Sequence, residues 1–444
     1  MTRSTQCMIV ACTLTLLSAF ACAQVSRMEV EVTLRQALAG MAAYEGRHGG
    51  WGTAYTRDGT IMWGQYRPIP ANWITVQPPA TPGVARVFFK AARVLEDDLY
   101  LMYVRRARDA LLAIQTPEGG FPHEDNPAKP IIGVGTFDDD VTTAALRFLI
   151  DWWQHTGAEE DRAAVIRVGE FILAAQHPCG GWPQAYPAAP GRYARHVTFN
   201  DGVTVNVIRA LFELHEVTGE QRFFDAAVRG GECILHLQGG PGEAVWAQQY
   251  DEETLEPAWA RKFEPPGYSA AESVGVCNVL IELYLATGEE RFLEALPRAF
   301  EWYDEHQLPN GKWARLYEPG TQRPVYGRRD KAVRVYDFAG ACDGYGWQGK
   351  WYPHAAKRAY ERIEAVGREA YLEERNAPAP PAPIPAAEVR RICAALSPEG
   401  LWVDTPSARD LDEYKLHGVA EDIPMVQTST FCRNALRLIA WLEQ

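Results

Sequence analysis

The sequence predicts an all-α protein with an α/α toroid fold, an incomplete (α/α) barrel built from repeated helical hairpins with long loops at one end. The first observation behind this prediction is a recurring phrase of a glutamine, a few residues, glycine and an aromatic residue, as in QTPEGGF, QHPCGGW and QLPNGKW. Its glutamines lie 61, 62 and 69 residues apart, at Gln115, Gln176, Gln238 and Gln307. Such a period is typical of arrays with one supersecondary unit per repeat.

The segments between these phrases have the hydrophobic spacing of helices. Residues 139–153 (DDVTTAALRFLIDWW) and 203–214 (VTVNVIRALFEL) place apolar side chains at helical intervals. Thr-Gly pairs at 156–157, 218–219 and 287–288 follow such runs, where glycine suits a C-terminal cap. A Glu-rich helix start comes next. Each repeat therefore predicts two helices, with inner helices packed around an axis and outer helices around them.

The aromatic residue of each phrase has two interpretations. Glycine permits the chain reversal because it adopts positive φ without strain, and the aromatic ring would then plug the end of a helical hairpin. Loops at the end of a ring of helices also carry function, and a tryptophan at a loop tip can stack on a sugar. We predict that Trp182 binds substrate, with the plugging role as the alternative.

Composition limits the class of ligand. The chain has 444 residues, of which 47% are hydrophobic and 23% charged, so a large core is available. The net charge of -13 and the absence of a Lys/Arg run argue against nucleic acid as a partner. The 14 Trp and 19 Tyr are compatible with carbohydrate stacking. We expect a monomer.

The first residues have the pattern of a secretory signal. Arg3 precedes an apolar stretch over residues 8–20, and Ala21-Cys22-Ala23 fits the small-x-small rule for cleavage near Ala23. The stretch is too short for a membrane span. We therefore expect residues 1–23 to be a signal peptide and the protein to be secreted or periplasmic. Lipidation of Cys22 is the alternative.

The rest of the chain divides at a proline-rich segment. Residues 376–386 include PAPPAPIP, which is typical of an extended connector. We expect the toroid to occupy residues 24–375, and residues 387–444 to form a further helical pair packed on it. Of the six cysteines after the signal, Cys277 and Cys432 lie in apolar helical runs and are expected to be buried thiols. No pair has zinc-site spacing, and the disulfide pairing stays open.

Two acidic clusters begin predicted inner helices. One is Thr136-Phe137-Asp138-Asp139-Asp140 and the other Thr198-Phe199-Asn200-Asp201, with 63 residues from Asp138 to Asp201. Asp at a helix start is favoured by capping and by the helix dipole alone. Three in a row, matched one repeat later, exceed that need. We expect Asp138, Asp139 and Asp201 to come together as oxygen ligands for a hard cation such as Ca2+.

Arginines in the later loops suggest recognition of carboxylates. Arg261, Arg328 and Arg329 lie in loops of a ring that carries an acidic cluster. Exposed arginines commonly form ion pairs of small energetic value. The guanidinium fork is nevertheless suited to binding a carboxylate with two hydrogen bonds.

Ordered segments of the chain resemble family 10 polysaccharide lyases, which are pectate lyases. The segments are TFDDDVTTAALRFL, GGWPQAYP, HVTFNDGVTVNVIRAL, WAQQYDEETLEPAWARKFE, AAESVGV and RPVYGRRD, within residues 49–351. The resemblance implies an α/α toroid and Ca2+-dependent β-elimination in polygalacturonate. It implies that Asp138, Asp139 and Asp201 hold calcium, that Asp138 and Asp201 also contact substrate, and that Arg261 binds substrate.

The resemblance also implies an arginine base in the Gly-Arg-Asp segment. Here that segment reads Gly327-Arg328-Arg329-Asp330, so pairing with the glycine selects Arg328 and pairing with the aspartate selects Arg329. An arginine base predicts an alkaline rate optimum, because the pKa of arginine is above 12. The chain departs from the family pattern at Asp139, where asparagine is usual, and at Gly202 and Lys331.

Two other functions fit the same sequence. Many α/α toroids are inverting glycoside hydrolases that use a pair of carboxyl groups. A non-catalytic polyuronate-binding protein would have the same loops without turnover. The sequence does not choose between endo and exo cleavage or state a methylation preference.

Overall fold

The computed structural model describes residues 25–405 and 423–444, apart from positions 66, 132 and 379–381. The expected signal peptide at residues 1–23 lies outside the described residues, as does part of the expected connector. The helices are α2 (Arg27–Ala42), α3 (Thr81–Val94), α4 (Leu101–Ile114), α5 (Val141–Thr156), α6 (Glu159–Ala175), α7 (Val203–Thr218), α8 (Gln221–Leu237), α9 (Ala270–Thr287), α10 (Arg291–Glu294), α11 (Leu296–Glu305), α12 (His354–Val366), α13 (Arg368–Asn376), α14 (Ala386–Ala394) and α16 (Thr428–Leu442).

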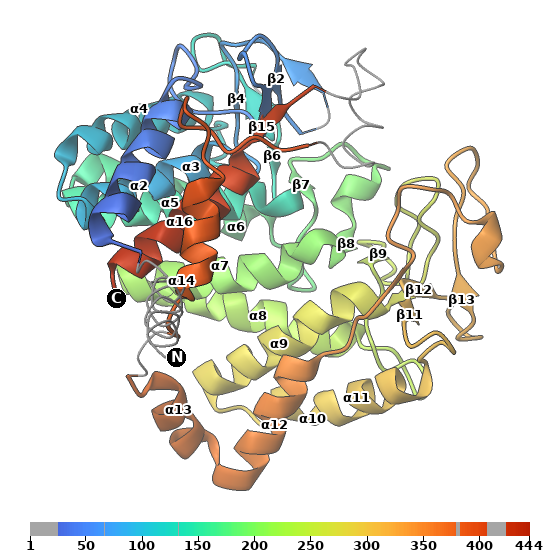
Figure 1. Ribbon diagram of the computed structural model, residues 1–444. Helices are drawn as coiled ribbons and strands as arrows, with labels where there is room; N and C mark the ends of the chain where they lie inside the picture. Colours follow the sequence, from blue (N-terminus) through green and yellow to red (C-terminus); the bar gives the residue numbers. More distant parts are fainter. Residues whose placement is uncertain (1–24, 66, 132, 379–381, 406–422) are drawn as a thin grey trace, which may run out of the picture.

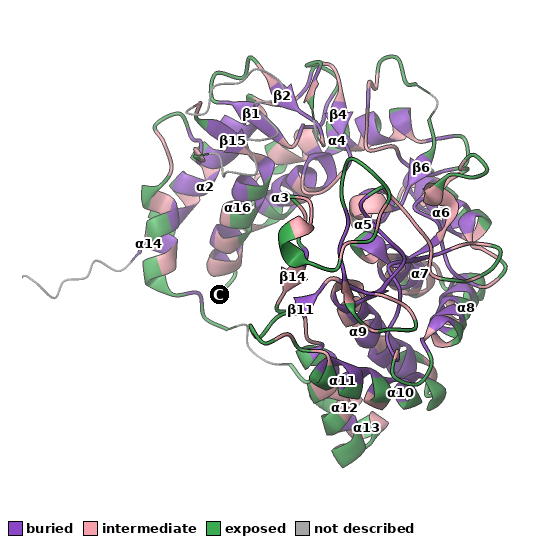
Figure 2. Ribbon diagram, turned by 90° about the vertical axis from the view of Figure 1, so that its right-hand side faces the viewer, coloured by how far each residue is buried: buried purple, intermediate pink, exposed green. Residues whose placement is uncertain are grey.

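The helices form two concentric layers. In the inner layer, contacts run from α16 to α3 and on through α5, α7 and α9 to α12. The outer helices α4, α6 and α8 each pair with the inner helix next to them in sequence, and Figure 1 shows the hairpins following one another around the molecule. Figure 2 shows the buried residues where the helices face each other and exposed residues on α13. The predicted incomplete α/α toroid is confirmed.

The Thr-Gly turns end the inner helices as expected. Gly157, Gly219 and Gly288 are the C-caps of α5, α7 and α9, with φ of 64°, 71° and 75°. This left-handed conformation costs glycine little because it has no Cβ. Each turn therefore sends the chain directly into the paired outer helix.

The Gly-aromatic turns fix each outer helix to the next. Gly180 has φ 101°, and a Cβ at this position would lie 2.2 Å from the backbone oxygen of Arg229 on α8. The side chain of Gln176 donates to the oxygens of Gly180 and Ala226, at 2.8 and 2.9 Å. Gly119 approaches Arg167 on α6 in the same way. The glutamine and glycine of the phrase are thus explained by the close contact between neighbouring repeats.

The tryptophans of these turns plug the ends of the hairpins. Trp182 is fully buried, and its indole Nε1 donates to the backbone oxygen of Ile172 at 2.9 Å. Trp51, Trp313 and Trp402 donate in the same way to residues ten positions earlier. The prediction that Trp182 binds substrate is therefore wrong, because helical packing encloses the ring and its one polar atom is satisfied.

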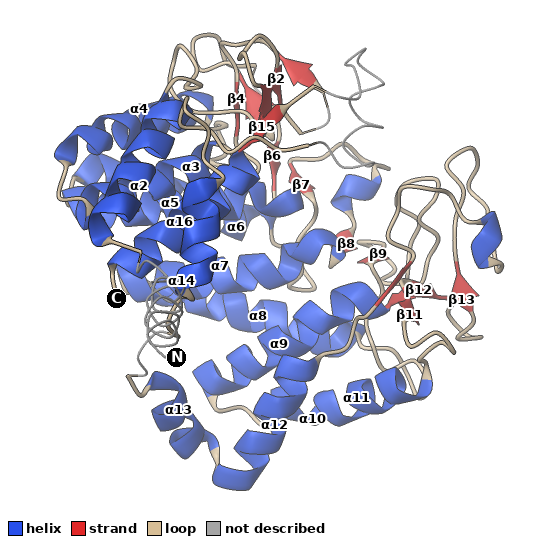
Figure 3. Ribbon diagram, in the orientation of Figure 1, coloured by secondary structure: helices blue, strands red, loops and turns tan. Residues whose placement is uncertain are grey.

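Short strands at one end of the helices join the loops of neighbouring repeats, and Figure 3 shows them extending from β2 to β13 beyond the helix ends. The pairs β4–β5, β6–β7 and β8–β9 each connect one repeat to the next. The strands are β1 (Ala54–Thr56), β2 (Met62–Trp63), β3 (Pro68–Ile69), β4 (Ile74–Thr75), β5 (Glu124–Asp125), β6 (Gly135–Thr136), β7 (Ala185–Tyr186), β8 (Val197–Thr198), β9 (Gln249–Tyr250), β10 (Tyr268–Ser269), β11 (Trp313–Ala314), β12 (Leu316–Tyr317), β13 (Pro324–Val325), β14 (Gln348–Gly349) and β15 (Met425–Gln427).

The end of the chain returns to its beginning. Strand β15 pairs antiparallel with β1, with Tyr55 opposite Val426. Helix α16 contacts both α2 and α3, and α14 contacts α2 and α16. Residues after the connector therefore pack on the N-terminal hairpins.

Helix α9 is apolar because it belongs to the inner layer. Among the described residues, it alone is long and apolar enough to meet the criterion for a membrane span. Its buried residues include Cys277, and it contacts α7, α8 and α12. Cys277 and Cys432 are both buried free thiols, as predicted.

Candidate active site

The acidic clusters form two similar turns, each just before an inner helix. The turn Asp138–Asp140 precedes α5, and the turn Asn200–Gly202 precedes α7. In both, two consecutive residues have positive φ: Asp139 and Asp140 at 50° and 62°, then Asp201 and Gly202 at 50° and 73°. Positive φ is uncommon for residues other than glycine and is found at functional sites. Helix α5 therefore begins at Val141, two residues later than the sequence pattern suggested.

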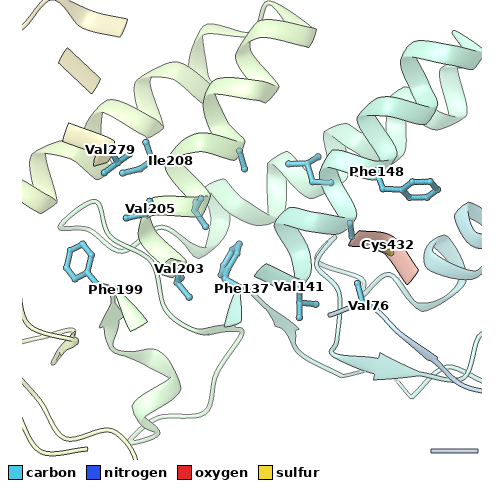
Figure 4. Packing of buried hydrophobic residues seen from close by; sticks show 14 of the residues in the cluster. Val76, Phe137, Val141, Phe148, Phe199, Val203, Val205, Ile208, Val279 and Cys432 are labelled. Carbon is cyan, nitrogen blue, oxygen red and sulfur yellow. The ribbon is translucent and has the colours of Figure 1, made fainter. Parts of the chain in front are cut away.

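The buried phenylalanines fix the register of the two turns. Phe137 and Phe199 are each 1% exposed, and Figure 4 shows both rings among the buried hydrophobic side chains. Counting from these anchors and from the matching φ values, Asp139 corresponds to Asp201, and Asp138 corresponds to Asn200. The sequence-based equivalence of Asp138 with Asp201 is thus wrong by one residue. The side chains of the two acids still meet.

Three carboxylates come together at the two turns. Oxygen atoms of Asp138, Asp139 and Asp201 all lie within 4.8 Å of one another. Asp138 and Asp139 are half-buried, and Asp201 is exposed to solvent. The three residues expected as oxygen ligands are therefore close enough to share one small ion.

The carboxylates repel one another. Burial, and then the charges of Asp139 and Asp201, raise the pKa of Asp138 to about 7. The pKa of Asp201 is also raised, first by partial desolvation of its carboxyl group and then by Asp139. Like charges at this separation disfavour ionisation unless a cation compensates them.

The carboxylates of the cluster suit a hard cation, and neighbouring side-chain amides hold them in place. Side-chain amides surround the acids: Gln65 donates to Asp139, Gln184 donates to Asp138 at 3.4 Å, and Asn200 donates to Asp201. Carboxylate and amide oxygens are the ligands that Ca2+ prefers. The residues present therefore fit a calcium ion, with Asp138, Asp139 and Asp201 as the holding set.

Arg261 faces this cluster. Its charge acts on both Asp138 and Asp201, and it lowers the pKa of each. Glu264, which is 2% exposed, accepts hydrogen bonds from Arg261 Nε and from its backbone nitrogen, at 2.7 and 3.0 Å. Burial alone would raise the pKa of Glu264, but the bonds from Arg261 lower it. In return, Glu264 raises the pKa of Arg261.

A tyrosine and a second arginine complete the wall of the site. Tyr345 donates its hydroxyl to Glu264 at 2.9 Å, and its ring lies 4.9 Å from the guanidinium carbon of Arg315. Arg315 also pairs with Glu272, and its charge lowers the pKa of Asp201. Sequence reasoning missed Arg315 and Tyr345. The sequence shows only that both residues lie in the loop after α11. Without the tertiary structure, nothing distinguishes them from the other residues of that loop.

The two arginines expected as the base occupy different environments. The guanidinium of Arg329 lies 4.5 Å from the centre of the Phe263 ring, and Arg261 lies 4.8 Å from the same ring. Both arginines are exposed, but Arg328 Nε pairs with Asp330 at 2.9 Å. Arg329 therefore borders the site through Phe263, whereas Arg328 points to a surface ion pair.

A second group of side chains that could bind a metal ion is already neutralised in part by an arginine. His196, Asp251 and Glu252 lie within 4.8 Å of one another. Glu252 already pairs with Arg195 and with His196, both at 3.0 Å. A cation would have to displace these partners, so the three aspartates are the stronger candidate.

A match to a known protein family covers several residues of this candidate site. The family model for pectic acid lyases matches residues 123–312. Over these residues the chain is similar to pectic acid lyases. The matched span contains the three aspartates, Arg261 and Glu264. The resemblance to polysaccharide lyases read from the sequence is thus confirmed over a shorter span than residues 49–351.

Solved structures similar to this chain include a family 10 polysaccharide lyase from Cellvibrio cellulosa. The two are 22% identical, the match covers 64% of this chain and 98% of that chain, and the TM-score is 0.49. A variant of that enzyme in complex with trigalacturonic acid matches equally well. A GH76 α-mannanase from Bacteroides thetaiotaomicron matches with 9% identity over 93% of this chain and 95% of that one, at a TM-score of 0.47. No curated protein matches the chain.

The candidate site also has residues outside the matched span. Gln65 reaches Asp139 from the loop between β2 and β3, and Arg315, Arg329 and Tyr345 come from the loops after α11. The ring brings these segments to the aspartates because the same ends of all its inner helices face one side. The site is therefore assembled from family and non-family segments.

Proposed function

We propose that the protein cleaves polygalacturonate by calcium-assisted β-elimination with an arginine as the base. The single observation that carries this proposal is the meeting of three carboxylates with Arg261 at one end of the ring. Carboxylates alone would repel an anionic polymer. Arginines alone could bind it, but the three aspartates would then have no role. A cation between them makes both sets useful.

We propose that Asp138, Asp139 and Asp201 hold the calcium ion. When bound, calcium would neutralise the uronate carboxylate and so acidify the proton on the neighbouring C5. By holding the cation, the aspartates would fix the position of the sugar carboxylate that binds to it. Gln65 and Gln184 orient the carboxylates by donating to them.

Arginines would orient the rest of the substrate. Arg315 pairs with Glu272, which is 5% exposed on its side chain, and this partner holds the guanidinium in place beside Asp201. Arg329 lies over the Phe263 ring, and its Nε donates to the backbone oxygen of Asp343 at 3.4 Å. Both suit the carboxylates of sugars on either side of the cleaved bond.

The proposed base is Arg261, with Arg329 second. A base must lie within reach of the proton that it removes, so the position of each arginine is considered before its pKa. Arg261 is beside the aspartates, and its pairing with Glu264 stabilises the protonated form that proton transfer would produce. The same pairing means that the neutral base is scarce at neutral pH, so the rate should rise through the alkaline range. Arg328 is the weakest of the three candidates because its guanidinium pairs with Asp330 at the surface.

The test is incubation with polygalacturonate and CaCl2, with the ultraviolet absorbance of unsaturated uronides as the readout. Arg261→Ala should lower kcat by at least about 100-fold. Arg329→Ala should raise KM more than it lowers kcat, and Arg328→Ala is the matched control that stays near wild type. EDTA should abolish the activity, and added calcium should restore it.

Each contrary result has a defined meaning. Loss of turnover in Arg329→Ala with activity kept in Arg261→Ala would move the base to Arg329. If none of the three variants loses activity, the arginine base is wrong. Reducing ends without unsaturated product would favour the hydrolase, and binding without any product would favour a non-catalytic protein.

We propose that residues 1–23 are removed on export and that the mature protein is a monomer. The N-terminal sequence of the exported protein and its elution volume in size-exclusion chromatography test these points. Retention of residues 1–23 would contradict the first, and a dimer the second.

A further inference from the structure

Two cysteines meet where one repeat packs on the next. Cys179 lies in the glycine turn after α6, and Cys233 lies on α8. Their sulfur atoms are 3.6 Å apart, and both are free thiols. Cys233 is 1% exposed, whereas Cys179 is half-buried.

The backbone holds these sulfurs in place. Gln176 donates to the oxygen of Ala226 on α8, and Arg229 donates back to the Gln176 side chain, both within 2.9 Å. A Cβ at Gly180 would lie 3.3 Å from the Cβ of Cys233. The turn cannot drift away from α8 while these contacts persist, so the closeness of the two thiols is a property of the fold.

The preceding repeat shows that the contact does not require cysteine. There the turn places Gly119 against Arg167 and Phe171 on α6, as Gly180 lies against Arg229 and Cys233. The residue before Gly119 is Glu118, which corresponds to Cys179. The same junction is thus built with a glutamate and a phenylalanine, and the thiol pair is an addition to it.

The geometry is close to that of a disulfide. A disulfide has sulfurs about 2.05 Å apart, so the two atoms need to approach by roughly 1.5 Å, which side-chain rotation and a small shift of the turn can supply. The S–H of Cys233 donates to Cys179 and lowers the pKa of the Cys179 thiol. The accessible sulfur is therefore the better nucleophile of the two.

We propose that Cys179 and Cys233 are a disulfide-forming pair that takes a small-molecule disulfide, such as oxidised glutathione, as its oxidant. The Cys179 thiolate attacks one sulfur of that disulfide and releases one thiolate of the small molecule. Cys233 then gives its proton to solvent and attacks Cys179 Sγ, which releases the second small thiol. One disulfide is made in the protein, and one is reduced to two thiols.

The bond would close a loop that carries part of the active site. The two cysteines are 54 positions apart, and the segment between them includes Asp201 and all of α7. A cross-link over such a loop restricts the unfolded chain and stabilises the folded one. It would join the turn of one repeat to the outer helix of the next. This inference does not depend on the proposed function.

The experiment uses the full chain, equilibrated with oxidised or reduced glutathione, alkylated and digested with trypsin without reduction. Cleavage after Arg167, Arg192, Arg229 and Arg261 gives peptides 168–192 and 230–261, each with one cysteine. We expect these two peptides to be linked in the oxidised sample and separate after reduction. The oxidised protein should unfold at a temperature about 5 °C higher than the reduced protein.

Two variants make the result specific. Cys179→Ser should abolish both the linked peptide and the dependence of Tm on glutathione. Cys342→Ser removes another half-buried loop thiol and should leave both unchanged. The proposal is overturned if both cysteines stay alkylated in the oxidised wild type, or if either links to a different cysteine. Because the peptides are read from the wild type, a variant that fails to fold does not decide the outcome.

Discussion

At the scale of single residues, the site depends on charges that the fold forces together. Asp139 and Asp201 adopt positive φ, a conformation that most side chains avoid. The same backbone brings their carboxylates to within 4.8 Å of Asp138. The resulting repulsion gives predictions that separate a cation site from a capping arrangement.

We predict that calcium stabilises the protein more at pH 8 than at pH 5.5. The pKa of Asp138 is raised to about 7, above the ordinary value near 4, so the folded protein keeps a proton that the unfolded chain has lost between these values. Stability without calcium should therefore fall as pH rises through that window. Above pH 7 calcium no longer competes with a proton. Thermal unfolding with CaCl2 and with EDTA at the two pH values measures this.

Asp201→Asn is the companion variant. It should remove most of the calcium-dependent rise in Tm while leaving the protein folded, because Asp201 is exposed. An equal calcium effect at both pH values, or a full effect in Asp201→Asn, would contradict a site formed by these acids.

Substitution of Tyr345 tests whether the contacts around Glu264 hold Arg261 in position. Its hydroxyl donates to the buried Glu264 at 2.9 Å, and Glu264 in turn holds Arg261. A hydrogen bond to a charged group contributes about 1.5 kcal/mol or more, so Tyr345→Phe should lower kcat about tenfold with KM little changed. Steady-state kinetics over the alkaline range should also show a displaced pH profile.

The control for this variant is Tyr326→Phe. The hydroxyl of Tyr326 contacts Gln348 at 3.1 Å and has no bond to Glu264. Its loss should leave kcat and the pH profile at wild-type values. Equal effects of both substitutions would indicate general loosening of the loops.

At the scale of elements, the repeated turn is a structural device. Its glutamine, glycine and tryptophan each contact a neighbouring outer helix or the helix just before the turn. The glycine turn lies at the start of the long loop between two hairpins. The acidic turns lie at the other end of such loops, just before an inner helix. Stability and chemistry thus reside in different phrases of one repeat.

We predict that Trp182 contributes to stability and not to substrate binding. Trp182→Ala should destabilise the protein by about 3–5 kcal/mol, since it removes a fully buried ring and leaves a cavity. Trp182→Phe should cost less, because most of the volume is kept and only the bond to Ile172 is lost. Denaturant unfolding measures both.

The kinetic readout distinguishes plugging from stacking. The KM of folded Trp182→Phe for polygalacturonate should equal that of wild type. A raised KM with unchanged stability would restore the substrate-binding interpretation.

At the scale of the whole molecule, the two ends of the chain share one packing unit. Strand β15 lies on β1, and α16 fills the space beside α2 and α3. Residues such as Phe431 and Leu438 are almost fully buried there. We therefore propose that residues 387–444 belong to the toroid and do not form a separate domain.

A chain that ends at residue 378 should fail to fold cooperatively. Its N-terminal hairpins would lose the cover of α14 and α16 and expose a large apolar surface. The full chain should instead unfold in one calorimetric transition. A soluble truncated chain with a sharp transition and full activity would show that the C-terminal pair is dispensable.

The sequence determined the helical repeats, the turn phrases and the types of residue at the site, because each follows from short-range rules of periodicity, capping and glycine conformation. Asp138, Asp139, Asp201 and Arg261 could therefore be named in advance, although the register between the two acidic turns came out one residue off. Only the tertiary structure decided that Trp182 is buried, that Arg328 faces solvent, that Gln65 and Arg315 lie near the aspartates, and that Tyr345 donates to Glu264. Those outcomes depend on which loops the closed stack of repeats brings together, and that is a long-range property that no local pattern encodes.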